Sequence, residues 1–257
     1  MKQYKVAIIG NGMICNAAHI PAYKAMGDKV KIVAVADIRE EAAKETAERH
    51  GIPKYYVDPY KMLEEEKPDI ISVCTPNAYH KEYTLAGFRA GCHVVCEKPV
   101  AVTCADAEEM SGKHLFVIQS LRFTGNFKAA AGLAKSGCLG DIYYADLNLV
   151  RRRGVPRWGM FHMAKENVGG AFCDLGVHMC DYLMSISGNP KMVSVSGSAV
   201  TRIVNKEKNI EFSNAESGAP TGLFTPRKFD MKEFDVEEFA NGYIRLENGM
   251  TVTFKIS

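Results

Sequence analysis

Short apolar runs alternate with amphipathic stretches along the first half of the chain. The runs are rich in β-branched residues and occupy residues 6–9, 32–36, 70–74, 93–96 and 115–118. Helical spacing of the apolar positions between them predicts helices over residues 12–26, 39–50 and 79–90. Short strands that are apolar on both faces and separated by helices are typical of a parallel sheet covered on both sides. Right-handed crossovers then make this α/β sheet doubly wound.

The second half of the chain contains several β-rich runs. They occupy residues 141–150, 193–204, 241–246 and 251–256. Glu247, Asn248 and Gly249 supply a hairpin turn between the last two runs. Because we find no helical pattern between several of these runs, they predict an antiparallel sheet.

Composition and charge exclude several classes of protein. The chain has 257 residues, is 47% hydrophobic and 24% charged, and carries a net charge of only +2. It is therefore a globular chain of one or two domains without an electrostatic surface for nucleic acid or a membrane. The apolar run at the N-terminus leads directly into a glycine turn, and no run approaches the roughly 18 apolar residues of a membrane span. We therefore expect a cytoplasmic protein with a small-molecule partner.

The eight cysteines are scattered through apolar strand and helix patterns, and none forms a CxxC pair. This distribution favours small buried hydrophobic residues in a reducing compartment over a disulfide framework. We predict no zinc site and no other metal site.

The turn GNGMIC follows the first predicted strand and matches the fingerprint G-x-G-x-x-G at Gly10 and Gly12, but not at its third glycine, where Cys15 stands. Gly10 would permit the tight turn, and Gly12 would let a pyrophosphate approach the backbone. Met13 and Ile14 begin a helix whose N-terminus offers free N–H groups and a partial positive charge.

An acidic residue, Asp37, ends the second predicted strand, 25 residues after Gly12. This position suits hydrogen bonds to the hydroxyls of an adenosine ribose, and a carboxylate there repels a 2′-phosphate. NAD is therefore favoured over NADP, although Arg39 keeps NADP possible. Asp37 can also cap the following helix, and the two roles are compatible.

The segment CTPNAYH ends the strand over residues 70–74 and begins the next helix. Its position predicts that Thr75, Pro76 and Asn77 lie against a bound cofactor. His80 is a weaker candidate, because a histidine at the start of a helix is commonly solvated.

The segment AGCHVVCEKP ends another buried strand with Glu97 and Lys98. Ligands of open α/β sheets lie outside the carboxyl ends of the strands, so this pair is expected to face a cofactor. The alternative for an isolated EKP is a surface ion pair.

A second group of chemically active residues lies in GGAFCDLGVHMCD. If the segment after Ala171 is an α-helix, Asp174, His178 and Asp181 fall at i, i+4 and i+7 and share one face. A carboxylate one turn away could orient the imidazole and raise its basicity, so that His178 takes a hydroxyl proton. The two preceding glycines would let the backbone approach a ligand. A buried structural histidine is the alternative.

Taken together, these segments resemble the Gfo/Idh/MocA oxidoreductases, named for glucose-fructose oxidoreductase and inositol dehydrogenase. The resemblance covers nearly the whole chain, and the most specific part is the pairing of AGxHVxxEKP with GGxxxDxGxHxxD. It implies a Rossmann domain over residues 1–120, then an α/β domain with a large, mostly antiparallel sheet over residues 121–257. It also implies assembly into a dimer or tetramer.

The resemblance implies a catalytic set of Lys98, Asp174 and His178. Lys98 would hold and polarise the reacting oxygen, His178 would act as acid or base, and Asp174 would support His178. Glu97 would contact the cofactor, and Arg157 and Trp158 would lie beside nicotinamide and substrate. The expected reaction is NAD-dependent oxidation of a secondary alcohol of a sugar or cyclitol. Redox-assisted glycoside cleavage and a non-catalytic NAD(H)-sensing protein are the alternatives.

Two features depart from the family pattern. The helix that begins near Ala105 reaches Ser111 after barely two turns, whereas relatives carry a longer helix there. The chain also ends at Ser257, inside what should be a continuing sheet domain. We expect both to reflect residues absent from this sequence.

Overall fold

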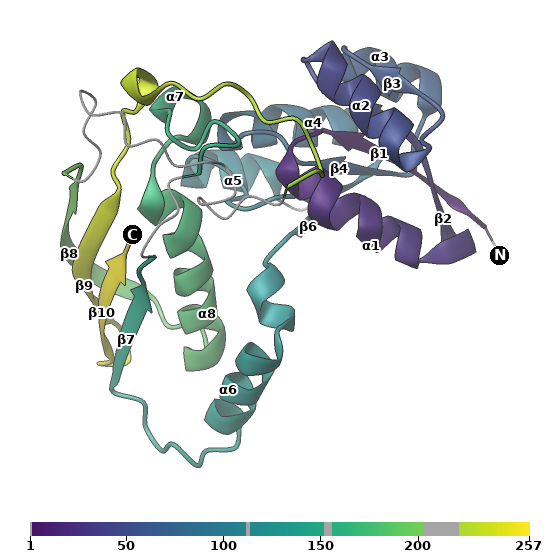
Figure 1. The fold of residues 1–257 in the computed structure, drawn as a ribbon. Helices are drawn as coiled ribbons and strands as arrows, with labels where there is room; N and C mark the ends of the chain where they lie inside the picture. Colours follow the sequence, from purple (N-terminus) through teal and green to yellow (C-terminus); the bar gives the residue numbers. More distant parts are fainter. Residues whose placement is uncertain (1, 112–113, 152–155, 203–220) are drawn as a thin grey trace.

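The first half of the chain folds into the predicted parallel sheet (Figure 1). The computed structural model describes residues 2–111, 114–151, 156–202 and 221–257. Six strands pair in the order β3-β2-β1-β4-β5-β6, and every pairing is parallel. The strands are β1 (Tyr4–Ile9), β2 (Val30–Ala36), β3 (Tyr55–Tyr56), β4 (Ile70–Val73), β5 (His93–Cys96) and β6 (Leu115–Val117).

Helices cover both faces of this sheet, as the strand pattern requires. They are η1 (Cys15–His19), α1 (Ile20–Ala25), α2 (Glu40–His50), α3 (Pro59–Glu66), α4 (His80–Arg89) and α5 (Cys104–Met110). Val6 and Ile8 of β1 pack in a core with residues of η1 and α1, whereas Ala7 and Ile9 belong to a second core with residues of α3 and α4. Successive side chains of β1 point to opposite faces of the sheet, so they pack in two separate cores. The seven-residue α5 matches the short helix expected from sequence, whereas β3 and α3 were not predicted.

The second half forms a four-stranded sheet in the order β7-β10-β9-β8. Its strands are β7 (Tyr144–Leu149), β8 (Met192–Val200), β9 (Phe239–Leu246) and β10 (Thr251–Ile256). The β8–β9 and β9–β10 pairings are antiparallel, and Gly249, with φ +85°, lies in the predicted hairpin. The expectation of an antiparallel sheet is wrong for β7, which pairs parallel to β10. A parallel neighbour of β7 cannot come from a tight hairpin. The chain first passes through helices and through β8 and β9, and only β10 then lies beside β7 and runs in the same direction.

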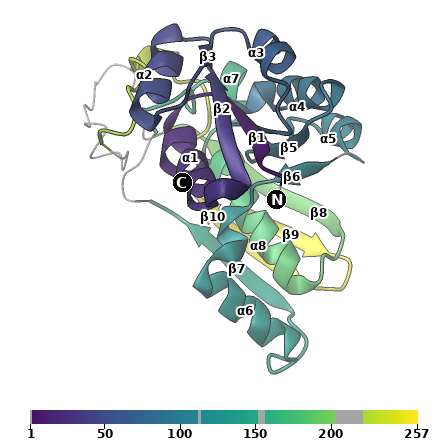
Figure 2. The same ribbon diagram turned by 90° about the vertical axis from the view of Figure 1, so that its right-hand side faces the viewer.

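A helical layer covers one face of this second sheet. It is formed by η5 (Phe172–Gly176) and α8 (Val177–Ser187), while α6 (Gly125–Lys135) packs on the other side of α8 and α7 (Ala164–Asn167) packs on η3 (Asn77–Tyr79) of the first half. Leu175 and Leu183 share a buried core with Ile244, Val252 and Ile256 of the sheet. Figure 2 shows this sheet and α8 below the first sheet. The packing fixes η5 and α8, the elements that carry Asp174 and His178.

The burial of the cysteines agrees only in part with the sequence prediction. All eight thiols are free, and Cys15, Cys74, Cys92 and Cys96 are buried as predicted. Cys104, at the start of α5, and Cys138, in the turn after residue 135, are exposed, so the expectation of burial is wrong for them. Within the described ranges, no helix is long and apolar enough to span a membrane, and no cluster of three or more metal-ligating side chains is found.

Candidate functional site

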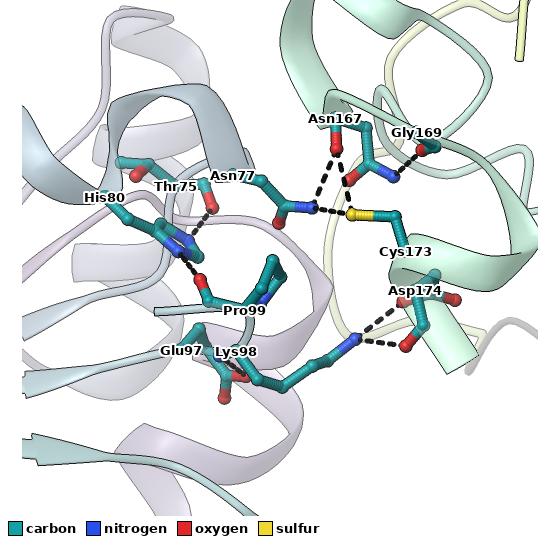
Figure 3. Close-up of polar contacts among 10 residues, drawn as sticks. All are labelled: Thr75, Asn77, His80, Glu97, Lys98, Pro99, Asn167, Gly169, Cys173 and Asp174. Atoms are coloured by element: carbon teal, nitrogen blue, oxygen red, sulfur yellow. Dashed lines mark hydrogen bonds and ion pairs between the residues drawn. The ribbon is translucent and has the colours of Figure 1, made fainter. Parts of the chain in front are cut away.

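Lys98 reaches from the end of β5 to the helical layer of the second half (Figure 3). Its Nζ lies 2.6 Å from Oδ1 of Asp174 and 3.0 Å from the carbonyl oxygen of the same residue. Each of the two side chains is only 16% exposed. An ammonium group has three donors, so these contacts leave one N–H available for another acceptor. The sequence-predicted Lys98 and Asp174 therefore meet although 76 residues separate them.

His178 lies on the first turn of α8, and its Nδ1 is buried without a hydrogen-bond partner. Burial lowers the pKa of His178, and the positive charge of Lys98 lowers it further, against the smaller opposing effects of Asp174, Glu97 and Asp181. The ring is therefore held in its neutral form at neutral pH, in which one nitrogen can accept a proton.

The expected arrangement of Asp174, His178 and Asp181 is partly wrong. Residues 172–176 form a π-helical turn rather than α-helix, which changes the angular spacing after Asp174. Asp174 bonds to Lys98, Asp181 pairs with Arg122, and Asp174 and His178, both described, share no hydrogen bond. Asp174 acts on His178 only through its charge, which raises the imidazole pKa.

The glycine pair Gly169-Gly170 makes room for neighbouring protein atoms, whereas its approach to a ligand stays a prediction. A Cβ on Gly170 would lie 1.8 Å from the carbonyl oxygen of Glu237. The carboxylate of Glu237 accepts the N–H groups of Gly170 and Phe172 at 2.8 and 2.9 Å. Glu237 therefore caps the π-helical turn that carries Asp174, a role that no local pattern around residue 237 signals.

The glycine turn and Asp37 have the geometry expected of a nucleotide site. Gly10 has φ +91°, and an added Cβ would meet the Cys74 backbone at 2.6 Å. Gly12 faces open space, with no heavy atom within 4 Å of an added Cβ. Met13 and Ile14 follow at the helix start. The turn therefore has a closed side at Gly10 and an open side at Gly12, where a pyrophosphate fits.

Two hydrogen bonds fix the carboxylate of Asp37. The backbone N–H groups of Asn11 and Arg39 donate to Oδ2 and Oδ1 at 2.8 and 2.9 Å. The Arg39 side chain lies beside Asp37, with an Nε–Oδ1 distance of 3.6 Å. Asp37 thus joins the glycine turn to the end of β2, and its oxygens keep lone pairs for a ribose.

The two glycines of this turn are expected to respond differently to alanine. Gly10→Ala should lower the free energy of unfolding by roughly 1–3 kcal/mol, because the methyl group clashes with backbone and the residue has positive φ. Gly12→Ala should change that free energy by less than about 0.5 kcal/mol yet weaken NAD binding at least about tenfold. Urea unfolding and NAD titration measure both. Unchanged NAD affinity in Gly12→Ala would contradict the assignment of the open side to the nucleotide.

The turn after β4 holds the two halves of the site together. Asn77 donates from Nδ2 to the carbonyl oxygen of Asn167 at 2.9 Å, so its amide nitrogen is committed to the second half of the chain. His80 is fully buried, and its ring nitrogens lie 2.7 and 3.0 Å from the carbonyl oxygens of Pro99 and Thr75. The alternative of a solvated His80 is therefore wrong, and both ring nitrogens already lie against backbone carbonyl groups. Thr75 Oγ1 is buried and unpaired.

The remaining candidates differ in where their side chains go. Glu97 is only 8% exposed, and its carboxylate bonds to His19 and to the backbone N–H of Lys98. The alternative of a surface ion pair is therefore wrong, whereas contact of Glu97 with the cofactor stays a prediction. The guanidinium of Arg157 lies 4.6 Å from the ring centroid of Phe229. Trp158 packs near Phe161, and its Nε1 is buried without a partner. Pro76 lies in the turn between β4 and Asn77.

A nucleotide turn, an acidic residue after β2 and a Lys–Asp pair between two domains define a dinucleotide-dependent oxidoreductase. Residues 4–114 match the model of the "Oxidoreductase family, NAD-binding Rossmann fold", and residues 127–257 match the "GFO/IDH/MocA C-terminal domain". The chain belongs to the Gfo/Idh/MocA family of NAD-binding oxidoreductases, as its motifs predicted.

Named relatives support this membership. The chain is 35% identical over 251 residues to D-glucoside 3-dehydrogenase of Escherichia coli, a match that covers 95% of this chain and 67% of the relative. It is 29% identical over 190 residues to myo-inositol 2-dehydrogenase of Thermotoga maritima, covering 72% of this chain and 55% of the relative. The chain thus spans between about half and two thirds of the length of these relatives.

The fold also matches solved structures. The WlbA dehydrogenase of Bordetella pertussis, in complex with NADH and UDP-GlcNAcA, superposes with a TM-score of 0.80 at 21% identity, covering all of this chain and 71% of that protein. An oxidoreductase domain protein of Kribbella flavida gives a TM-score of 0.81 at 23% identity, covering 100% and 68%. At these identities the likeness shows the fold.

Proposed function

We propose that this chain oxidises a secondary alcohol of a sugar or cyclitol, with Lys98, Asp174 and His178 as its catalytic set. The observation that carries the proposal is the contact between Lys98 Nζ and Asp174 Oδ1 at 2.6 Å, which joins the nucleotide-binding domain to the helical layer bearing His178. A contact of this kind places the catalytic residues at the boundary between the two domains, where a cofactor bound to the first domain and a substrate would meet.

Lys98 holds the reacting oxygen in this mechanism. Two of its N–H donors are used by Asp174, and the third is available for the hydroxyl oxygen of the substrate. As the hydroxyl proton leaves, negative charge develops on that oxygen, and a fixed ammonium group stabilises it more in the transition state than in the ground state. Asp174 sets the direction of the ammonium group.

His178 receives the hydroxyl proton. Its pKa is lowered by burial and by the charge of Lys98, so the ring is neutral and able to act as a base at neutral pH. In the reverse direction the imidazolium returns the proton to the carbonyl oxygen. The charge of Asp174, which raises the pKa of His178, stabilises this protonated form.

NAD, when bound, supplies the acceptor for the hydride that leaves the same carbon. The open side of Gly12 and the free N–H groups at Met13 and Ile14 would hold the pyrophosphate, with Gly10 shaping the turn. Asp37 would bind the ribose hydroxyls, with Arg39 beside it. The unpaired buried atoms Thr75 Oγ1 and Trp158 Nε1 are suited to partners brought by cofactor or substrate. Asn77 and Glu97 would support this region through their hydrogen bonds to the Asn167 carbonyl and the Lys98 N–H, and Pro76 and Arg157 stay candidates for contact with the cofactor.

The charge of Asp37 is expected to set the preference for NAD over NADP. Asp37→Asn keeps the shape of the side chain but removes the repulsion of a 2′-phosphate, so the ratio of NAD to NADP affinity should fall by about tenfold. Titration of both cofactors measures that ratio. Asp58→Asn is the matched control, because it removes the same charge at the start of α3. An unchanged ratio in Asp37→Asn would show that another residue makes the discrimination.

The substrate class is tested with a panel of glucosides, aldoses and inositols, because two relatives are named for a D-glucoside and for myo-inositol. NADH absorbance is followed for each compound, together with release of the aglycone from the glycosides. NADH formation on one of these classes supports the proposal. Aglycone release without NADH would instead indicate redox-assisted cleavage. NAD binding without turnover of any compound would indicate an NAD(H)-sensing protein.

We further propose that the chain works in the cytoplasm as a homo-oligomer, a dimer or a tetramer. Eight free thiols support a reducing compartment. Large apolar side chains left exposed around the second sheet, among them Tyr143, Val193 and Val195, support association. Native mass spectrometry gives the number of subunits and any retained cofactor in one measurement.

A further inference from the structure

A chain of buried polar side chains runs through the interior of the nucleotide-binding domain. The hydroxyl groups of Tyr23 and Ser72 are 2.7 Å apart, and Ser72 Oγ lies 3.2 Å from Nδ1 of His19. Nε2 of His19 lies 3.0 Å from Oε1 of Glu97. All four residues are less than 9% exposed, and Ser72 is fully buried. Polar groups this deep in a core are costly unless each is paired.

This chain of contacts joins three elements that have separate tasks. His19 belongs to η1, the helical turn that follows the nucleotide-binding glycines, and Ser72 lies in the middle of β4. Glu97 directly follows β5, next to Lys98. The second oxygen of Glu97, Oε2, accepts the backbone N–H of Lys98 at 3.2 Å. Glu97 therefore holds the backbone of Lys98 with one oxygen and His19 with the other.

The carboxylate of Glu97 depends on these donors. Burial raises its pKa, but the hydrogen bond from His19, the charge of that ring when it is protonated, and the N–H and charge of Lys98 together lower the pKa by more, so that the net shift is downward. An ionised Glu97 requires a donor at Oε1, so Nε2 of His19 carries hydrogen. Nδ1 then accepts from the hydroxyl of Ser72 when the ring is neutral.

We propose that His19 is a positioning residue for the reaction: through its Nε2 hydrogen bond it fixes Glu97, which in turn fixes the backbone of Lys98 and so the direction of the ammonium group. This rests on the proposed function for the role of Lys98. His19 itself touches neither Asp174 nor His178. A displaced Glu97 would let the Lys98 backbone shift, and displacements of about 1 Å at reacting groups cost about a hundredfold in rate.

Two amide substitutions separate this role from a merely structural one. In His19→Gln the amide nitrogen can reach the place of Nε2 and still donate to Glu97. In His19→Asn the shorter side chain places its amide near Nδ1 and leaves Glu97 without its donor. Thr46→Val is a structural control. The hydroxyl of Thr46, in α2, accepts a hydrogen bond at 3.3 Å from Asn16, which lies in the same helical turn as His19, and Thr46 forms no hydrogen bond with Glu97.

The experiment compares kcat, KM, urea unfolding and amide hydrogen exchange of the peptide spanning residues 96–98 in the full chain. His19→Asn should lower kcat by about ten- to a hundredfold, with KM within about threefold, since Lys98 acts chiefly in the transition state. It should also speed exchange of the Lys98 amide more than exchange elsewhere. His19→Gln should restore kcat and exchange to within about threefold of wild type, and Thr46→Val should lose stability with kcat unchanged.

Two results would overturn the inference: equal kcat in His19→Asn and His19→Gln once the folded fraction is accounted for, or equal exchange of the Lys98 amide in both. The exchange measurement needs no substrate. If wild type oxidises no compound of the panel, the proposed function fails, while the difference in exchange between the two variants still decides the role of His19.

Discussion

Replacing Lys98 with methionine is expected to lower kcat by about a hundred- to a thousandfold, the usual cost of removing one fixed donor that stabilises developing negative charge. Methionine keeps much of the length and the apolar stem of lysine, so the loss reports the charge. NAD affinity should stay within about twofold, because Lys98 Nζ is directed to Asp174 rather than to the glycine turn. Steady-state kinetics and NAD titration check the two halves of this expectation.

The matched control for Lys98→Met is Lys81→Met. Lys81 also forms a lysine–carboxylate pair in the first domain, with Asp106 and Glu109, but this pair links α4 to α5 and lies more exposed. Its removal should leave kcat unchanged and cost at most about 1 kcal/mol of unfolding free energy. A Lys98→Met rate within a few-fold of wild type would remove Lys98 from the catalytic set.

His178→Asn is the second large expected effect, a loss of about a hundred- to ten-thousandfold in kcat for alcohol oxidation, the range that a general base contributes. In wild type, kcat/KM should fall as pH drops through the His178 pKa, because the protonated ring cannot accept a proton. That pKa lies below the ordinary 6.5, so the midpoint of the fall should lie at a pH below that value. The variant should lose this acidic limb. An unchanged limb would assign the base to another group.

The same pKa gives a test that needs no turnover. Burial lowers the His178 pKa first and the charge of Lys98 second, while Asp174 raises it. In Lys98→Met the second cause disappears and Asp174 remains, so the pKa of His178 should rise. NMR titration of the His178 ring in the two proteins measures this shift. A pKa that stays in place would mean that the two groups do not share one site.

Local patterns predicted the parts of the site that follow from chain geometry. Strands with two buried faces require helices on both sides, which places Gly12, Asp37 and Lys98 at the carboxyl edge of one sheet. The meeting of Lys98 with Asp174 followed from the resemblance of two motifs, because no periodicity relates residues 76 positions apart. The structure brings Lys98 and Asp174 together, and the role of His178 as the base is tested by the kinetics of His178→Asn.

The rest depended on partners that sequence spacing cannot show. Gly170 is small because Glu237 packs on it, and Glu97 is drawn inward by His19, 78 residues earlier. The parallel β7–β10 pairing depends on the order in which the chain revisits the second sheet. One signal was available for His19: it lies four residues after Cys15 and four before Tyr23, on the buried face of its helix, where a histidine requires partners.

The most direct test of the account is the stoichiometry of NADH to substrate, measured with the compound of the panel that the wild-type chain converts fastest. The account predicts one NADH and one ketone for each substrate consumed, and the loss of both in Lys98→Met and His178→Asn. Substrate consumption without accumulation of NADH, or unchanged yields in the two variants, would contradict it.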